Sequence, residues 1–280
     1  MRSSAIRPAS LIVTLLLLAM ASHAGAAAVP VEVKRTDAGW QLLRDGEPYT
    51  IKGAGGDQYL HLLAASGANS IRTWGAGPKT KALLDEAYRY GLTVTVGIWL
   101  GHERHGFDYN DLDQVAKQLD HVREVVTMYK DHPAVLAWGV GNEMEGYEAG
   151  DNAAIWSHVE ACAALIKRLD PHHPTMTVIA EVGGKKVEAI HRLCPSIDIV
   201  GINSYAGAKS LPTRYPKAGG TKPYVVAEFG PPGAWEVEKT SYGAPGELTS
   251  TQKGPVYRAV YEALDADRGM CLGSYAFLWG

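Results

Sequence analysis

The stretch AVLAWGVGNEMEG, Ala134–Gly146, joins an almost continuous apolar run to an end that carries carboxylates. The run from Val135 to Val140 has the length and composition of a strand that is buried on both faces, as in a parallel sheet covered by helices. Asn142 and Glu143 follow directly, so an amide and a charge stand where a core strand ends. A charge in this place indicates either an exposed loop residue or the working acid of an active site.

Seven further apolar runs resemble this one, and amphipathic segments separate them. The candidate strands are Tyr49–Gly53, Asn69–Thr73, Thr93–Ile98, Val135–Val140, Thr175–Ile179, Ile197–Ile202, Tyr224–Ala227 and Leu272–Phe277. Helical patterns lie between them at about residues 57–66, 79–90, 111–131, 151–169, 184–193 and 253–267. Eight strands that alternate with helices in one domain predict an α/β fold of the closed (β/α)8 TIM barrel type.

An open doubly wound sheet is the alternative fold, and it should carry a glycine-rich phosphate turn after its first strand. The stretch IKGAGGDQ has glycines there, but Gly53 and Gly56 lack the further glycine spacing of either nucleotide fingerprint. We therefore interpret this stretch as a tight turn between a strand and a helix.

The eighth predicted strand is followed only by a few residues up to Gly280. A (β/α)8 barrel normally carries a helix over the outer face of its eighth strand. Two explanations are open: the sequence is a shortened form of the natural domain, or the strand is covered in another way.

The first 26 residues have the three-part layout of a secretory signal peptide. Arg2 and Arg7 precede the apolar run Leu11–Met20, and Ala24-Gly25-Ala26 offers a cleavage site. The apolar run is too short to span a bilayer. We expect residues 1–26 to be removed and residues 27–280 to form one domain that is secreted or periplasmic.

Charge and cysteine content limit the classes of function. Cleavage would remove two arginines and no acidic residue, which leaves 25 basic against 30 acidic side chains and a net charge of −5. Without a basic run, the chain offers no electrostatic footprint for nucleic acid, and no second apolar run could cross a membrane. Cys162, Cys194 and Cys271 are widely spaced, so three buried free thiols are favoured over one disulfide with a leftover thiol.

Polar and aromatic residues gather where the predicted strands end, which in a barrel is the catalytic face. These ends carry Arg72 and Trp74, Trp99 and His102, Asn142 and Glu143, Glu181, Asn203 to Tyr205, Glu228, and Trp279. Glu143 and Glu228 would face one another across the barrel mouth. Cleavage of a glycosidic bond needs such a pair, because one carboxyl donates a proton while the other stays ionised to attack the sugar.

The order of these motifs resembles clan A, the large group of retaining glycoside hydrolases built on (β/α)8 barrels. WGVGNEMEG is similar to the Asn-Glu motif of the clan's fourth strand, and YVVAEFG to its nucleophile motif on the seventh. IRTWG, INSYAG and FLWG place an arginine, a tyrosine and a tryptophan at matching strand ends. The resemblance covers essentially the whole chain after the signal peptide.

The resemblance implies a role for each matching residue. Glu143 would be the general acid/base and Glu228 the nucleophile, with Arg72 and Tyr205 contacting Glu228. Asn142 would bind the sugar 2-hydroxyl, and Trp279 would form the floor of the subsite for the reacting sugar.

Other residues near the mouth are weaker candidates. The clan often has a histidine near the end of the third strand, and GHERHG offers both His102 and His105. Trp74, Trp99 and Trp235 would stack on sugars or pack at the rim. Glu145 and Glu148 are interpreted as a solvated loop, and Glu181 as an alternative substrate contact. The segment Gly230–Thr251 is long for a connection and would shape the substrate cleft.

We therefore expect an exported retaining β-glycoside hydrolase without a cofactor, acting on an oligo- or polysaccharide, with β-glucan as the first choice ahead of β-mannan and β-galactosides. Transfer to a sugar hydroxyl by the same site would make the protein a β-glucanosyltransferase. Two rivals stay open: a carbohydrate-binding barrel without turnover, and a metal-dependent hydrolase or deacetylase that uses His102 and His105.

Overall fold

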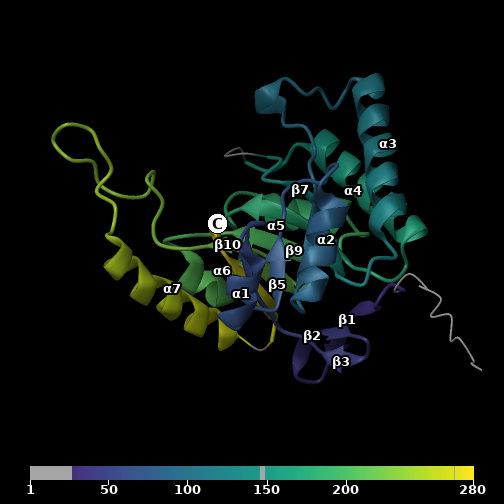
Figure 1. The fold of residues 1–280 in the computed structure, drawn as a ribbon. Helices are drawn as coiled ribbons and strands as arrows, with labels where there is room; N and C mark the ends of the chain where they lie inside the picture. The colour runs from purple at the N-terminus through teal and green to yellow at the C-terminus, as the bar shows by residue number, and fades with distance from the viewer. Residues whose placement is uncertain (1–26, 146–148, 268) are drawn as a thin grey trace, which may run out of the picture.

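The structure is a computed structural model that describes residues 27–145, 149–267 and 269–280. The predicted signal peptide and Glu148 therefore lie outside the described residues. Figure 1 shows strands wrapped into a barrel, with helices around it and a small sheet below.

Eight parallel strands close into a barrel in the order β10-β11-β4-β5-β6-β7-β8-β9. The strands are β4 (Ile51–Gly55), β5 (Ser70–Arg72), β6 (Thr93–Ile98), β7 (Val135–Asn142), β8 (Thr175–Ala180), β9 (Ile199–Asn203), β10 (Tyr224–Phe229) and β11 (Cys271–Ala276). Pairing of β11 with β4, for example Gly273 opposite Ile51, closes the ring. The prediction of a (β/α)8 barrel with these eight strands is confirmed.

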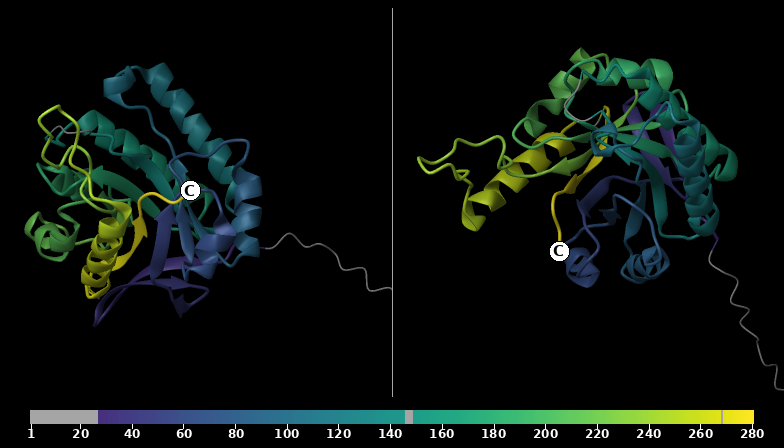
Figure 2. Two further views of the ribbon diagram at one scale, coloured as in Figure 1. Left: turned by 60° about the vertical axis from the view of Figure 1, so that its left-hand side comes forward. Right: turned by 90° about the horizontal axis from the view of Figure 1, so that it is seen from above.

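Helices follow seven of the eight strands and surround the barrel (Figure 2). They are α1 (Leu60–Ala65), α2 (Thr80–Arg89), α3 (Leu112–Tyr129), α4 (Ala153–Leu169), α5 (Lys186–Leu193), α6 (Leu211–Lys217) and α7 (Ser250–Asp265), with 3-10 turns at Glu103–His105 and Ala208–Ser210. Side-chain caps mark the beginning of the long ones: Asp111 accepts from two backbone amides of α3, and Thr249 forms a capping box with Gln252 at α7. Helix α6 was not predicted, because Pro212 and Pro216 interrupt its pattern.

An antiparallel sheet, also absent from the sequence-based prediction, covers the end of the barrel where the strands begin. It consists of β1 (Val31–Thr36), β2 (Gly39–Arg44) and β3 (Glu47–Pro48). The Val31 amide donates to the His172 carbonyl ahead of β8, and the Trp40 amide donates to the Gly269 carbonyl ahead of β11. Leu42 is fully buried against the inner barrel residues. The sheet therefore closes the end opposite the mouth.

Two apolar layers hold the barrel together. The outer layer lies between strands and helices, and the inner layer fills the barrel with residues such as Leu136, Met176 and Val225. Tyr275 stands inside the barrel, where its hydroxyl hydrogen-bonds Ser70 at 3.0 Å and Thr95 at 2.7 Å. Because both faces of the strands are buried, their sequences are apolar almost without alternation.

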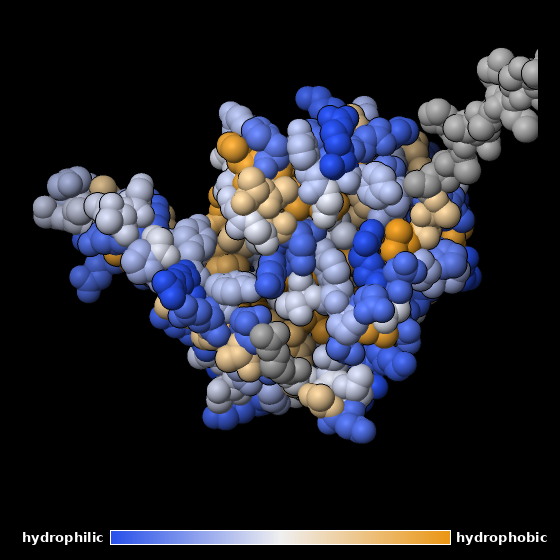
Figure 3. Space-filling view, turned by 60° about the horizontal axis from the view of Figure 1, so that its bottom comes forward, coloured by the Kyte–Doolittle hydropathy of each residue, from blue (hydrophilic) through white to orange (hydrophobic). Residues whose placement is uncertain are grey.

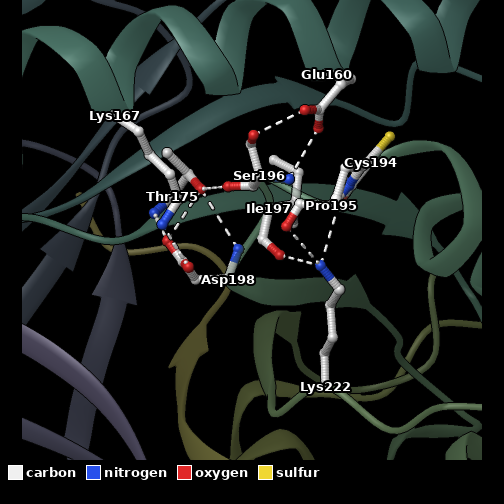
Figure 4. A network of polar contacts seen from close by, with 9 residues as sticks. All are labelled: Glu160, Lys167, Thr175, Cys194, Pro195, Ser196, Ile197, Asp198 and Lys222. Carbon is white, nitrogen blue, oxygen red and sulfur yellow. Dashed lines mark hydrogen bonds and ion pairs between the residues drawn. The ribbon is translucent and has the colours of Figure 1, made fainter.

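A polar network fixes the turn between α5 and β9 (Figure 4). The Lys222 ammonium donates to the carbonyls of Cys194, Pro195 and Ile197, and Glu160 accepts from the amide and the hydroxyl of Ser196. The cysteines are free, with Cys162 and Cys194 buried and Cys271 partly so.

The outer face of β11 is packed by α7 on one side and is open on the other. A groove of about 620 Å³ lies there. Its lining includes Ser66–Ala68 after α1, Tyr257, Arg258 and Tyr261 of α7, and Ala276, Leu278 and Trp279. Within the described residues, α7 packs against β11 and no helix occupies the groove on its other side. None of the described helices is long and apolar enough to cross a membrane.

The surface in Figure 3 is mostly hydrophilic, with apolar residues in small separate patches. The segment between β10 and α7 projects from the side of the molecule (Figures 1 and 2). It includes Trp235 and Tyr242, whose side chains are exposed.

Candidate active site

The barrel brings the polar strand ends together at its mouth, because all eight strands run parallel. Arg72 ends β5, Asn142 ends β7, Asn203 ends β9 and Glu228 lies near the end of β10. Hydrogen bonds join these four strands: Arg72 donates to both Asn142 and Glu228, and Asn203 donates to Asn142 and to Glu143. The residues that the sequence placed on separate strands therefore form one cluster.

Glu228 is buried, and three side chains donate to its carboxylate. Arg72 Nη1 lies 3.0 Å and Trp74 Nε1 2.8 Å from Oε1, while the Tyr205 hydroxyl lies 2.7 Å from Oε2. Arg72 is itself buried, and burial lowers the pKa of its guanidinium while the charge of Glu228 opposes that shift. Both carboxylate oxygens are thus held by donors, one of which carries a full positive charge.

Tyr205 remains a hydrogen-bond donor over the ordinary pH range. Burial first, and then the negative charge of Glu228, raise the pKa of its hydroxyl well above the usual value. The Tyr205 ring packs edge-on against Trp235 and Phe277, with centroids 5.3 Å and 5.9 Å away. These contacts fix the ring that orients Glu228.

Glu143 has a different environment, since its backbone lies in the left-handed region with φ of 51°. Its amide donates to the Val178 carbonyl at 2.8 Å, and its carbonyl accepts from Arg104 at 3.0 Å, which hold this uncommon conformation. The carboxylate is half-buried and accepts from Asn203 at 2.8 Å on one oxygen. No other described side chain donates to it.

Asn142 shares its two side-chain neighbours with the two glutamates, Arg72 with Glu228 and Asn203 with Glu143. Its side-chain oxygen accepts from Arg72 Nη2 at 2.6 Å and from Asn203 at 3.3 Å. With that oxygen occupied, the amide nitrogen is the group that remains to donate to a ligand.

The structure separates the two histidine candidates. His102 is buried, its Nε2 lies 2.8 Å from the Asn142 carbonyl, and its ring packs 4.8 Å from Trp99, whereas His105 is exposed. Burial, followed by the charge of Arg104, lowers the pKa of His102, so its imidazole is neutral near pH 7 and Nε2 donates to the carbonyl. Within the parts of the chain that the structure describes, no group of three or more His, Cys, Asp or Glu residues could hold a metal.

The tryptophans take different positions. Trp74 contacts Glu228, and its ring lies edge-on to Phe277 at 5.8 Å. Trp279 is partly exposed and its Nε1 donates to the Gln58 carbonyl at 2.9 Å, which links the end of β11 to the connection after β4. Trp99 and Trp235 are 43% and 68% exposed, so both are accessible to a ligand.

The interpretation of Glu145 as a solvated residue is wrong. Glu145 is only 4% exposed, because the segment after β7 folds back against β8. Its Oε1 accepts from the Ala180 amide at 3.2 Å and lies 3.5 Å from Lys186 Nζ, and burial raises the pKa of its carboxyl. Glu181 is paired with Arg214 at 2.6 Å and accepts from Ser204.

Two residues of the cluster were not singled out as site residues from the sequence. Asn203 contacts the Glu143 carboxylate, and Arg104 holds the Glu143 carbonyl. Asn203 ends a predicted strand, so its position was a usable signal. Arg104 lies in a 3-10 turn, and a turn gives no periodic pattern from which its direction follows.

Comparison with known proteins relates the chain to glycoside-cleaving enzymes. Residues 57–232 match the family described as "Glycosyl hydrolases family 2, TIM barrel domain". The β-glucuronidase of Streptococcus agalactiae is 28% identical over 161 residues, which are 53% of this chain and 26% of that protein. The human β-glucuronidase is 28% identical over 186 residues, which are 59% and 26%. The chain thus spans about a quarter of the length of these relatives.

Solved structures show the same fold. A family 2 β-galacturonidase from Eisenbergiella tayi superposes with a TM-score of 0.67 at 20% identity, covering 90% of this chain and 46% of that one. The β-glucuronidase of Ruminococcus gnavus gives 0.65 at 17% identity, covering 89% and 46%. At these identities the likeness concerns the barrel alone.

Proposed function

The chain belongs to the TIM barrel domain family of glycosyl hydrolases family 2, and from this premise we propose that it cleaves β-glycosidic bonds with retention of configuration. Membership agrees with the expectation of a (β/α)8 barrel of the glycoside hydrolase type. The residues that perform the reaction and the sugar are parts of the proposal.

In the first step the Glu228 carboxylate attacks the anomeric carbon, and the bond to the leaving oxygen breaks. Glu143 gives its proton to that oxygen, so the leaving group departs as an alcohol. The product is a glycosyl ester on Glu228.

In the second step the ionised Glu143 accepts a proton from water as the water attacks the anomeric carbon. The ester bond breaks, Glu228 is released, and Glu143 is protonated again. A sugar hydroxyl in place of water would give transglycosylation by the same site.

The assignment of the two roles rests on one observation: the two carboxylates accept different numbers of hydrogen bonds. Glu228 receives three donors and one positive charge, which suits a group that must stay ionised, whereas Glu143 receives one neutral amide on one oxygen. An acid/base residue must be able to gain and lose a proton during turnover, and few fixed donors leave it able to do so.

Neighbouring groups have supporting roles in the proposal. The free amide nitrogen of Asn142 would donate to the 2-hydroxyl of the reacting sugar, and Trp279 would offer a ring to its apolar face. His102 would hold the Asn142 backbone in place through the 2.8 Å bond to its carbonyl.

For the substrate we propose a β-linked glucan, with a β-glucuronide as the second candidate. The glucan is the first choice from the sequence, where the clan A motifs indicate the reaction and the loops determine the sugar; the glucuronide is suggested by relatives that bear the name β-glucuronidase. The two differ by a carboxylate on the reacting sugar, so one set of substrates separates them. Export through residues 1–26 belongs to the same proposal, and N-terminal sequencing of secreted protein would test it.

The deciding experiment is a panel of 4-nitrophenyl β-glycosides and β-linked oligosaccharides, with products followed by proton NMR. We expect the β-anomer to appear first and to mutarotate later. An α-anomer as the first product would contradict double displacement. Full activity in EDTA would remove the metal-dependent rival, and absence of turnover together with sugar binding would favour the non-catalytic one.

A further inference from the structure

A cavity separate from the groove beside β11 lies next to the catalytic cluster, at the ends of β4, β5 and β11. We call it the β4/β5 cavity; its volume is about 720 Å³, within the range of ligand pockets. Its lining includes Gly56, Asp57, Gln58, Trp74, Lys79 and Trp279. Trp74 belongs both to this lining and to the donors of Glu228, so the cavity begins one side chain from the proposed nucleophile.

The barrel order gives the cavity a direction relative to the reaction. Glu143 follows β7, and β11 stands four strands away from β7 in the ring of eight, which is the opposite side of the mouth. The acid protonates the leaving oxygen, so the leaving group lies on the side of Glu143. The β4/β5 cavity, on the far side, therefore faces the part of the substrate that stays bound to Glu228.

Two adjacent glycines make room for the aromatic walls of the cavity. A Cβ on Gly55 would lie 2.8 Å from the Trp74 ring, and one on Gly56 would lie 2.0 Å from the Trp279 carbonyl. Gly56 also has φ of 138°, which side chains rarely adopt. Two glycines of IKGAGGDQ, a stretch that does not match a nucleotide fingerprint, thus allow two tryptophans to lie beside the first strand of the barrel.

The cavity presents polar side chains that have no partner among the described residues. Asp57, Gln58 and Lys79 are exposed, and their side chains form no hydrogen bond or ion pair with another described residue. One acid, one base and one amide beside the Trp74 ring suit a neutral polyhydroxylated ring, whose hydroxyls accept and donate while its C–H face lies on that indole; Trp279, assigned to the reacting sugar, borders both positions.

We propose that the β4/β5 cavity is a subsite for a second sugar, attached to the reacting sugar on the side away from the scissile bond. The enzyme then acts within or near the end of a β-linked chain, and a disaccharide or longer unit is transferred to Glu228. This inference rests on the proposed function, and it deepens it by assigning a chain of neutral sugars as the substrate class.

The test compares 4-nitrophenyl glycosides that share the reacting sugar, the β-glucoside against the β-cellobioside and β-laminaribioside, scored by release of nitrophenol. We expect kcat/KM to be at least about tenfold higher for one of the disaccharides, from the added hydrogen bonds and ring contact. Asp57→Ala should reduce that preference by about fivefold to tenfold. Asp37→Ala, an exposed acid in the turn of the β1–β3 sheet, is the matched control and should leave both rates unchanged.

Equal rates on the single-sugar and two-sugar glycosides, or a preference that Asp57→Ala does not reduce, would overturn the subsite. A single-sugar glucuronide that exceeds every disaccharide would overturn it as well. If no glycoside is cleaved, the proposed function fails, and the subsite is judged by titrating E228Q with cellotetraose and laminaritetraose. Binding that weakens in E228Q/D57A supports it, and absence of binding overturns it.

Discussion

The two ends of the barrel differ in how the polar side chains there are hydrogen-bonded. At the end where the strands begin, Asp170 Oδ2 accepts from Trp138 Nε1 at 2.8 Å and lies 2.7 Å from His173 Nδ1, and a three-stranded sheet covers the opening. At the mouth, Glu143 and Glu181 have positive φ, and Glu143 has a single side-chain donor. At the first end the Asp170 carboxylate is hydrogen-bonded within the protein, whereas at the mouth one oxygen of the Glu143 carboxylate accepts from no described side chain.

The sharpest test of this difference is Glu228→Gln. The amide keeps the shape of the side chain but cannot attack the anomeric carbon, so kcat on the best aryl glycoside should fall on the order of 10⁴-fold. Because the buried Arg72 also loses its ion partner, the melting temperature should fall, and kcat is therefore measured at a temperature where the variant is folded. Glu262→Gln, on the exposed face of α7, is the control and should change neither quantity. Turnover by Glu228→Gln at the wild-type rate would contradict the role of Glu228 as the nucleophile.

Glu143→Gln should have the next largest effect, and its size should depend on the leaving group. Loss of the proton donor should lower kcat/KM by about 10²- to 10⁴-fold for oligosaccharides, whose leaving oxygen needs a proton. The loss should be much smaller for a dinitrophenyl glycoside, because that group leaves as an anion. A loss that is the same for both leaving groups would contradict the role of general acid.

At the opposite end, Asp170→Ala should affect stability rather than turnover. It leaves the Trp138 and His173 nitrogens buried without a partner, which costs about 2–5 kcal/mol of unfolding free energy. Urea unfolding measures the loss, with Asp120→Ala on the exposed face of α3 as the control. KM and kcat at a temperature where the variant is folded should match the wild type; a fall in kcat would show that the two ends are coupled.

The smallest expected effect is a dependence of stability on acid pH through Asp170. Burial would raise the pKa of this carboxyl, but the hydrogen bond and charge of His173 and the bond from Trp138 outweigh it and hold the pKa below the ordinary 3.8. A carboxyl with a lowered pKa in the folded state stabilises the fold above its unfolded pKa, so this contribution is lost as the pH falls below about 4. Unfolding free energies of wild type and Asp170→Asn, measured between pH 3 and 6, should converge at the acid end. Parallel curves would exclude this linkage.

The parts of the fold that were predicted are those with a repeated physical pattern. Apolar runs such as Val135–Val140 and Ile197–Ile202 are strands because both faces are buried, and the amphipathic segments between them are helices. The β1–β3 sheet was not predicted, since its short strands carry few buried residues and their contacts are to distant turns. Local sequence does not encode such contacts.

In the candidate site, too, some residue positions were predicted from the sequence and others were not. Residues at strand ends, such as Arg72, Glu228 and Tyr205, were placed because parallel strands deliver their ends to one mouth. The burial of Glu145 could not be anticipated, because it depends on how the segment after β7 folds over β8. The direction of Trp74 toward Glu228 likewise depends on the space left by Gly55.

The pairing that closes the ring joins β4 to β11, two strands that are more than 200 residues apart in the chain. During synthesis from the N-terminus, β4 gains β5 early but has an unpaired edge until β11 emerges. Contacts at such separation form late, because the cost of closing the intervening loop must be met first. In that interval the free edge of Ile51–Gly55 is a surface on which another chain could add a strand, so the rate of ring closure governs how long the nascent protein is open to aggregation.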